Sequence, residues 1–153
     1  MKECKINIAA GGIDMCRGSK QVEGWFTIHA CKYPCFIECG SKDYLSHSDG
    51  TNLYLNMIDA GHPIYTKQII NIVEKWITDI VRKRVEENND EAIQIMIHCN
   101  QGKSRSQLLR MWISSKMYGT TFEDEESDVI KNDETYQPSE SLREEFKKNW
   151  PVK

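Results

Sequence analysis

Apolar residues recur along this chain with two periods, one typical of strands and the other of helices. Alternating or short apolar runs predict strands at residues 4–8, 25–30, 53–58 and 93–97. Helical spacing predicts a long helix over residues 64–85, a second from Arg105 to Gly119, and a last one with Leu142, Phe146 and Trp150 on its inner face. Strands that alternate with helices predict a single α/β domain, residues 1–153, whose central, mostly parallel sheet is flanked by helices on both sides.

Three polar stretches modify this picture. Residues 40–52 are rich in Gly, Ser, Asp and Asn, which predicts a surface loop. Residues 123–134 hold seven acids and one lysine, a net charge of −6, and we predict a second surface loop there, irregular or weakly helical. The chain total of −3 leaves +3 for the remainder, which favours an anionic ligand but lacks the basic stripe of a nucleic-acid-binding protein. Ser141 and Glu144 have the spacing of a capping box for the last helix.

The most specific pattern follows the strand at 93–97, where the chain reads His98-Cys99-Asn100-Gln101-Gly102-Lys103-Ser104-Arg105-Ser106. A short loop between a strand and a helix turns backbone N–H groups inward, and the helix dipole adds positive potential there. Arg105 can bind two oxygens of a tetrahedral dianion, and the same field stabilises the thiolate of Cys99. The residues from Asn100 to Arg105 therefore predict a phosphate-binding loop with Cys99 as its nucleophile.

This segment resembles the Cys-x5-Arg signature of the protein tyrosine phosphatase superfamily, in the form found in its dual-specificity branch. Residues 29–35 and 52–59 are also similar to small phosphatases of this branch from phages and bacteria. The resemblance implies a phosphomonoester hydrolase that acts through a cysteinyl-phosphate, without metal or another cofactor. It implies a protein tyrosine or dual-specificity phosphatase, whose partners are proteins that carry phosphotyrosine or phosphoserine and phosphothreonine.

The resemblance also implies roles for single residues. Ser106 helps the thiolate leave in the second step, and His98 braces the loop. A general-base role for His98 is disfavoured because neighbouring residues of an extended strand point to opposite sides. The general acid is expected at Asp59, just past a buried strand, and 40 residues before Cys99. Asp43 and Asp49 are the alternatives.

Cysteines outside the loop raise the question of metal binding. Cys31, Cys35 and Cys39 recur every four residues near His29. Zinc sites usually combine two short pairs, and only one cluster is present, so we predict no metal site; packing or a redox role for one of these thiols stays open. The run Gly102-Lys103-Ser104 imitates a nucleotide-binding P-loop, but that motif needs a glycine where Ile97 stands.

Substrate and location are the least determined properties. Lys103 adds a second cation to the loop, as in family members that act on phosphoinositides or RNA 5′-triphosphates, and triphosphorylated RNA is the only nucleic acid we consider. A catalytically weak phospho-motif binding module is the alternative from another class. The N-terminus has no apolar signal region, and no apolar run approaches the roughly 20 residues that span a bilayer. A reactive thiolate needs a reducing compartment, so we expect a cytoplasmic protein, in the host cytoplasm if a phage encodes it.

Overall fold

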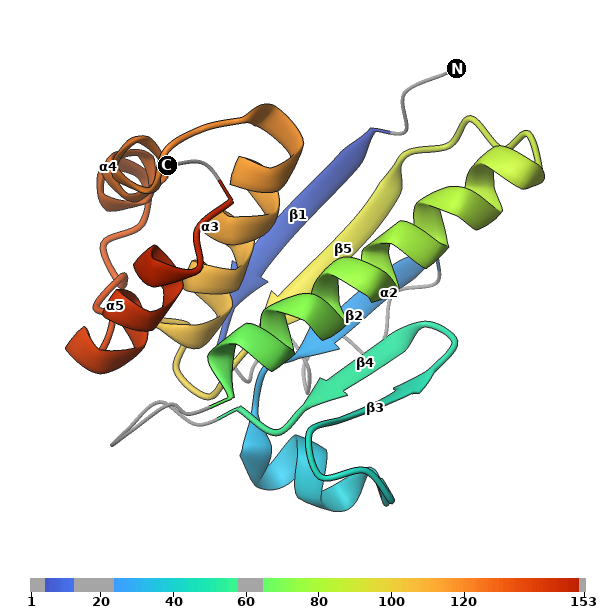
Figure 1. Ribbon diagram of the computed structural model, residues 1–153, viewed down its shortest axis with the longest axis horizontal. Coiled ribbons are helices and arrows are strands. Elements are labelled where there is room, and N and C mark those ends of the chain that lie inside the picture. Colours follow the sequence, from blue (N-terminus) through green and yellow to red (C-terminus); the bar gives the residue numbers. More distant parts are fainter. Residues whose placement is uncertain (1–4, 13–23, 58–64, 152–153) are drawn as a thin grey trace.

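A five-stranded sheet forms the centre of the computed structural model, which describes residues 5–12, 24–57 and 65–151 (Figure 1). Its strands are β1 (Ile6–Gly11), β2 (Trp25–His29), β3 (Ser46–Asp49), β4 (Asn52–Leu55) and β5 (Ile93–His98), in the spatial order β1-β5-β2-β4-β3. Strands β1, β5, β2 and β4 run parallel, and β3 is the antiparallel edge strand. The predicted α/β fold with a mostly parallel sheet flanked by helices is confirmed.

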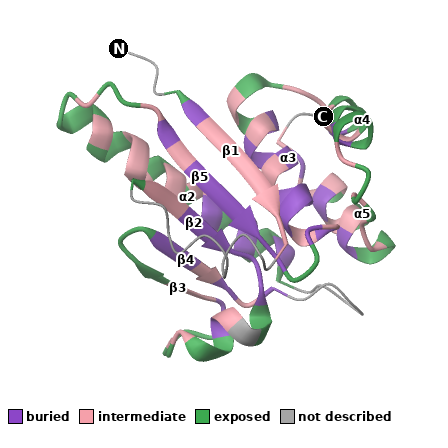
Figure 2. Ribbon diagram, turned by 180° about the vertical axis from the view of Figure 1, so that it is seen from behind, coloured by how far each residue is buried: buried purple, intermediate pink, exposed green. Residues whose placement is uncertain are grey.

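The helices of the described residues gather on one face of this sheet, whereas the sequence predicted helices on both sides. They are α2 (Thr66–Glu86), α3 (Arg105–Tyr118), α4 (Phe122–Asn132) and α5 (Glu140–Lys148), and a short helical turn, η1 (Lys32–Phe36), follows β2. Helix α2 crosses in front of the sheet in Figure 1, and no described helix crosses the face seen in Figure 2. Within the described ranges, no helix is both long and apolar enough to cross a membrane.

Strands β2 and β5 present different side chains on their two faces. On the face toward the helices, Ile28 of β2 and Ile95 and Ile97 of β5 are fully buried in the hydrophobic core. The intervening positions carry His29 on β2 and His98 on β5, which pair in register. Because successive strand residues point to opposite sides, the two histidines project together from the face away from these isoleucines.

The acidic segment is a helix, α4, so the predicted surface loop at 123–134 is wrong. The side chain of Thr121 caps its start by accepting a hydrogen bond from the backbone N–H of Asp124 at 3.1 Å. Acids in its first turn interact favourably with the helix dipole. Phe122 and Val129, seven residues apart, are both buried, so the helix has an apolar face beneath its charges.

Two further local predictions are corrected. Residues 40–52 contain the strand β3 and the turn into β4, where Gly50 adopts φ 71°. The polar residues of β3 suit an edge strand, which is half-buried at best. At the last helix, Ser139 occupies the N-cap position, so Ser141 and Glu144 lie inside α5 and form no capping box. The predicted inner face is confirmed for Leu142 and Phe146, which are buried in α5; Trp150 is also buried but follows the end of the helix.

Candidate active site

The loop that joins β5 to α3 lies at the carboxyl ends of the parallel strands, where α/β folds usually place their ligands. Cys99 is buried, and its backbone N–H donates to the carbonyl of Gly11 at the end of β1, at 3.1 Å. Gly12 forms an isolated bridge with Gln101. The loop therefore rests directly on the backbone that leaves the neighbouring strand.

Glycine is required at position 102 for two independent reasons. Gly102 has φ 74°, a left-handed conformation that side-chain-bearing residues rarely adopt. A Cβ atom there would also lie 2.7 Å from backbone atoms of Gly11 and Gly12. Gly11 is the last residue of β1, and Gly12 follows it. The structure shows that these residues form the floor on which the loop packs.

The thiol of Cys99 has two hydrogen-bonding neighbours. The backbone N–H of Gly102 donates to Cys99 Sγ at 3.3 Å, and Ser106 Oγ lies 3.3 Å from the same sulfur. Ser106 Oγ also donates to the carbonyl of Gly11 at 3.1 Å, so its single proton serves either that carbonyl or the sulfur. Burial opposes ionisation, but the hydrogen bonds from Ser106 and Gly102 and the charge of Arg105 lower the pKa of Cys99 below its ordinary value.

Arg105 stands at the first position of α3 with its guanidinium spanning the site. One terminal nitrogen donates to the carbonyl of Met57 and the other to Asn100 Oδ1, both at 2.7 Å. Its Nε is buried and has no hydrogen-bond partner among the residues that the structure describes. A buried donor without a partner is costly, and an oxygen of a bound oxyanion would satisfy it.

Asn100 links the loop to the segment after β2. Its Nδ2 donates to the carbonyl of Tyr33 at 2.8 Å, and the thiol of Cys31 donates to its Oδ1 at 3.1 Å. Cys31 is a buried, free cysteine. The first of the three clustered cysteines therefore packs against the loop.

Gln107 supports the loop from within α3, a role that the sequence analysis missed. Its Nε2 donates to the carbonyl of Gly102 at 3.1 Å and to Asp133 Oδ2 at 2.6 Å. Gln107 is a buried polar side chain that is only 1% exposed. Helical periodicity alone does not indicate a functional role at this position. Asp133, which the sequence analysis assigned to an acidic surface loop, holds this glutamine in place.

The chain between α4 and α5 also contacts the loop. The backbone N–H of Gln137 donates to the carbonyl of Lys103 at 2.9 Å, and that of Ser139 donates to Ser104 Oγ at 3.3 Å. Ser104 is 1% exposed. These contacts join residues more than 30 positions apart, so no local sequence pattern indicated them.

His98 lies on the other side of β5 from the core and is fully buried. Its Nε2 lies 2.6 Å from His29 Nδ1, and His29 Nε2 lies 2.8 Å from Asn52 Oδ1. Burial, followed by the neighbouring His29 and Arg105, lowers the pKa of His98 to about 4. The imidazole is therefore neutral at pH 7, and its hydrogen bond to His29 fixes the strand residue that precedes Cys99.

The predicted general acid, Asp59, lies outside the described residues. The chain that leads to it reaches the site, because the carbonyl of Met57 accepts from Arg105. Of the two alternatives, Asp43 accepts from the backbone N–H of Leu45, and Asp49 accepts from Asn52 on the far side of His29 from the loop.

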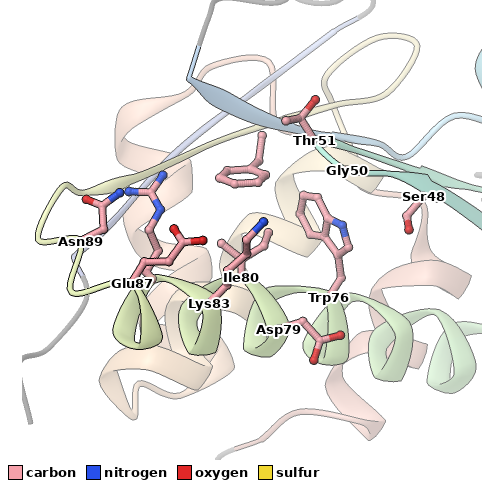
Figure 3. A pocket seen from close by; sticks show the side chains of 11 residues that line it. Ser48, Gly50, Thr51, Trp76, Asp79, Ile80, Lys83, Glu87 and Asn89 are labelled. Atoms are coloured by element: carbon pink, nitrogen blue, oxygen red, sulfur yellow. The ribbon is translucent and has the colours of Figure 1, made fainter.

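A separate hollow of about 520 Å³ lies between α2 and the turn that joins β3 to β4 (Figure 3). Its lining includes Trp76, Asp79, Lys83 and Glu87 of α2, or of the turn that follows it, and Thr51 opposite them. This hollow is at the amino ends of the parallel strands, whereas Cys99 follows the carboxyl end of β5. It therefore belongs to a different region from the cysteine loop.

Comparison with known proteins gives structural but not sequence relatives. No family model and no curated protein matches the chain. The PTP-2 phosphatase of Cydia pomonella superposes with a TM-score of 0.63 at 17% identity, over 93% of this chain and 84% of that one. DUSP15 superposes with a TM-score of 0.63 at 14% identity, over 97% of this chain and 85% of that one. The human tyrosine phosphatase-like serine/threonine/tyrosine-interacting protein superposes with a TM-score of 0.57 at 14% identity, over 82% of this chain and 76% of that one.

These similarities establish the fold. The chain shares its fold with PTP-2 phosphatase and DUSP15, which confirms the resemblance seen in the sequence at the level of fold. Identities of 14–17% do not carry activity or substrate from one protein to another. Function has to be argued from the residues of the loop.

Proposed function

We propose that this protein is a metal-independent phosphomonoester hydrolase that acts through a cysteinyl-phosphate on Cys99. The observation that carries the proposal is the arrangement of the loop. Cys99 Sγ lies 3.3 Å from the backbone nitrogen of Gly102 and 3.3 Å from the hydroxyl oxygen of Ser106. Arg105 follows the same loop, and its buried Nε has no hydrogen-bond partner among the residues that the structure describes. These groups combine a nucleophile, a hydroxyl and oxyanion donors in one short segment.

In the first step, Cys99 Sγ attacks phosphorus and the bond to the leaving oxygen breaks. Asp59 donates a proton to that oxygen, as the resemblance implies for this position. Arg105 and the backbone N–H groups of the loop bind the equatorial oxygens, whose charge they stabilise without reorganising. The neutral His98 braces the loop through His29 and takes no proton.

In the second step, water attacks the phosphorus of the cysteinyl-phosphate and the sulfur–phosphorus bond breaks. Asp59, now a carboxylate, accepts a proton from that water. The Ser106 hydroxyl, 3.3 Å from the sulfur, turns its proton from the Gly11 carbonyl to the departing thiolate. The products are inorganic phosphate and the starting thiolate.

The substrate is proposed to be a phosphorylated protein, with phosphotyrosine as the first choice. The support is the Ser104-Arg105-Ser106 end of the loop and the fold shared with PTP-2 phosphatase and DUSP15. Lys103 favours the polyanionic alternatives, phosphoinositides and RNA 5′-triphosphates. The salt dependence of hydrolysis distinguishes phosphotyrosine from these polyanionic substrates. The contribution of Lys103 to binding a polyanion should fall as added salt screens its charge.

A phospho-motif binding module is the second candidate. One structural relative is named a phosphatase-like interacting protein, so this fold alone does not decide between catalysis and binding. Cys99, Arg105 and Ser106 are all present here, which favours catalysis.

A substrate panel tests the proposal. Phosphotyrosine and phosphoserine peptides, phosphoinositides and 5′-triphosphorylated RNA are each incubated with the protein in EDTA, beside a Cys99→Ser control. We expect the wild-type protein to release phosphate from the phosphotyrosine peptide and the Cys99→Ser variant to release none. The variant should still bind oxyanions, because Arg105 and the backbone N–H groups of the loop remain. Peptide binding without phosphate release from any substrate would establish the binding module instead.

A further inference from the structure

A second group of reactive side chains lies directly behind the loop. His29 Nδ1, His98 Nε2 and Cys35 Sγ all lie within 4.8 Å of one another. The two histidines are buried and Cys35 is half-buried. Imidazole nitrogens and a thiolate are the ligands that zinc prefers in proteins.

The fold brings these three residues together from distant parts of the chain. His29 and His98 are register partners on the parallel strands β2 and β5. Cys35 comes from the turn η1, and its Sγ lies 3.9 Å from His98 Nε2. The spacing of the three cysteines predicted no metal site because it does not show that His98, 63 residues after Cys35, completes the cluster.

The surroundings of His29 orient it as a ligand. Asn52 Nδ2 donates to Asp49 Oδ1 at 3.0 Å, so its amide oxygen faces His29 Nε2 at 2.8 Å. That oxygen can only accept, so Nε2 carries the proton and the lone pair of Nδ1 is directed at the cluster. An outer hydrogen bond of this kind fixes the tautomer of most metal-binding histidines. The ring of Tyr54 stacks on His29 at 4.3 Å and 7°, and so defines its plane.

We propose that this cluster binds Zn²⁺ through His29 Nδ1, His98 Nε2 and Cys35 Sγ. Zinc fits this mixed nitrogen and sulfur set because it is a borderline-soft cation that binds both imidazole nitrogen and thiolate sulfur. Hard cations such as Mg²⁺ prefer oxygen ligands.

The arrangement of the two rings needs a small adjustment for zinc to enter. The two imidazole nitrogens are 2.6 Å apart, a hydrogen-bonded distance. With zinc–nitrogen bonds of about 2.0–2.1 Å, tetrahedral ligands lie about 3.3 Å apart, so the rings separate by about 0.7 Å. The proton between them moves to His98 Nδ1, and the Cys35 thiol releases its proton to solvent. A slide of His29 within its ring plane keeps the stacking on Tyr54.

Binding at this cluster acts on the loop because His98 immediately precedes Cys99. A zinc ion that pulls His98 away from its present position displaces the strand end that holds the nucleophile. We therefore expect Zn²⁺ to inhibit the enzyme without being needed by it. This consequence rests on the proposed phosphatase function, whereas zinc binding itself does not.

Cobalt substitution tests the site without reference to activity. Co²⁺ bound by a thiolate gives a charge-transfer absorption band, which is recorded in the Cys99→Ser background so that the nucleophile cannot be the ligand. We expect the band in Cys99→Ser, its loss on adding Cys35→Ser, and its retention on adding Cys39→Ser. Cys39 is the matched control, since it lies one turn further along and its thiol donates to the Phe36 carbonyl at 3.0 Å.

Zinc affinity and inhibition complete the test. In a competition with a chromophoric chelator, we expect Cys35→Ser and His29→Gln each to weaken Zn²⁺ binding at least tenfold, while Cys39→Ser leaves it unchanged. Cys35→Ser should retain its basal phosphatase activity and resist zinc. A cobalt band that survives Cys35→Ser, or that Cys39→Ser removes, overturns the site. If the band follows the expected pattern but no substrate is hydrolysed, the site stands and the proposed function fails.

Discussion

Cys99 and His98 are neighbours in the chain, yet they meet opposite environments at the end of β5. The pKa of each is lowered, but the consequences for charge are opposite. A lowered pKa favours the negative thiolate of Cys99, whereas it keeps the imidazole of His98 neutral. Backbone N–H groups, Ser106 and Arg105 surround the sulfur, whereas His29 and the protein interior surround the imidazole.

This contrast shows how one strand end separates chemistry from support. The side of Cys99 is built to hold negative charge, first on sulfur and then on phosphate. The side of His98 is built from a chain of hydrogen bonds that runs from the Asp49 carboxylate through Asn52 and His29. Changes on the first side should therefore affect turnover, and changes on the second side should affect stability and its pH dependence.

The largest effect is expected from Arg105→Lys, on the side that holds charge. A lysine cannot reproduce the planar fork, so we expect kcat/KM to fall about 10³-fold, the upper range for loss of an oxyanion donor. Arg110→Lys, in the next turn of α3, is the matched control and should stay near wild-type activity. Steady-state kinetics with a phosphotyrosine peptide measure both, and equal losses would contradict a specific role for Arg105.

Gly102→Ala should break the packing between the loop and β1. We expect about 4 kcal/mol of lost stability, from about 1 kcal/mol of backbone strain and about 3 kcal/mol of overpacking against Gly11 and Gly12. Gly119→Ala is the control, since Gly119 has φ 70° but nothing within 4 Å of its added Cβ. Urea unfolding should show only the strain component for Gly119→Ala. Similar losses in both variants would mean that the close approach of β1 is unimportant.

The pH dependence of stability should identify the side of His98. The folded pKa of about 4 lies below the unfolded value of 6.5, so between these pH values the unfolded chain binds a proton that the folded chain does not. Stability is complete above pH 6.5 and falls as the pH drops toward 4, by up to about 3 kcal/mol. We expect unfolding in urea and EDTA to show this loss, and His98→Gln to reduce it.

His29 also has a lowered pKa, chiefly through burial, so part of the loss should survive in His98→Gln. A wild-type protein with equal stability at pH 7 and pH 4.5 would contradict the account of a neutral histidine pair.

The smallest effect is expected at Glu126 and Arg143, which join α4 to α5 away from the site. Two hydrogen bonds of 2.7 Å from Arg143 lower the pKa of Glu126. The ionised Glu126 carboxylate therefore stabilises the folded protein above the unfolded pKa of 4.5. This contribution to the free energy of unfolding is lost as the pH falls through the lower folded pKa. Glu126→Gln should cost about 1 kcal/mol at pH 7 and nothing at low pH, in urea unfolding. If the contribution of Glu126 is instead lost between pH 6.5 and 4.5, the pH range of a stability loss cannot distinguish the His98 region from the contact between α4 and α5.

The sequence predicted the parts of this molecule that depend on local spacing. The strand at 93–97, the helix that ends at Gly119 and the loop around Cys99 all carry their signals within a few residues. Helix α4 was missed because its charges masked the two buried residues Phe122 and Val129. The hairpin of β3 was missed because an exposed edge strand needs few apolar residues.

Long-range pairing explains what the sequence could not predict of the candidate site. His29 and His98 are 69 residues apart, and only the parallel register of β2 and β5 places them together. Gln107 is supported by Asp133, 26 residues away, through contacts that no periodicity encodes. The sequence therefore indicated the reacting groups but not the side chains that hold them.

Identification of the phosphorylated residue is the most direct test of the central claim. Ser106→Ala should slow departure of the thiolate and allow the intermediate to accumulate during turnover of a phosphotyrosine peptide. Rapid quenching, digestion and mass spectrometry should then find a phosphate on Cys99. Hydrolysis with no phosphocysteine, or a phosphate on the neighbouring His98, would contradict the division of roles between these two residues.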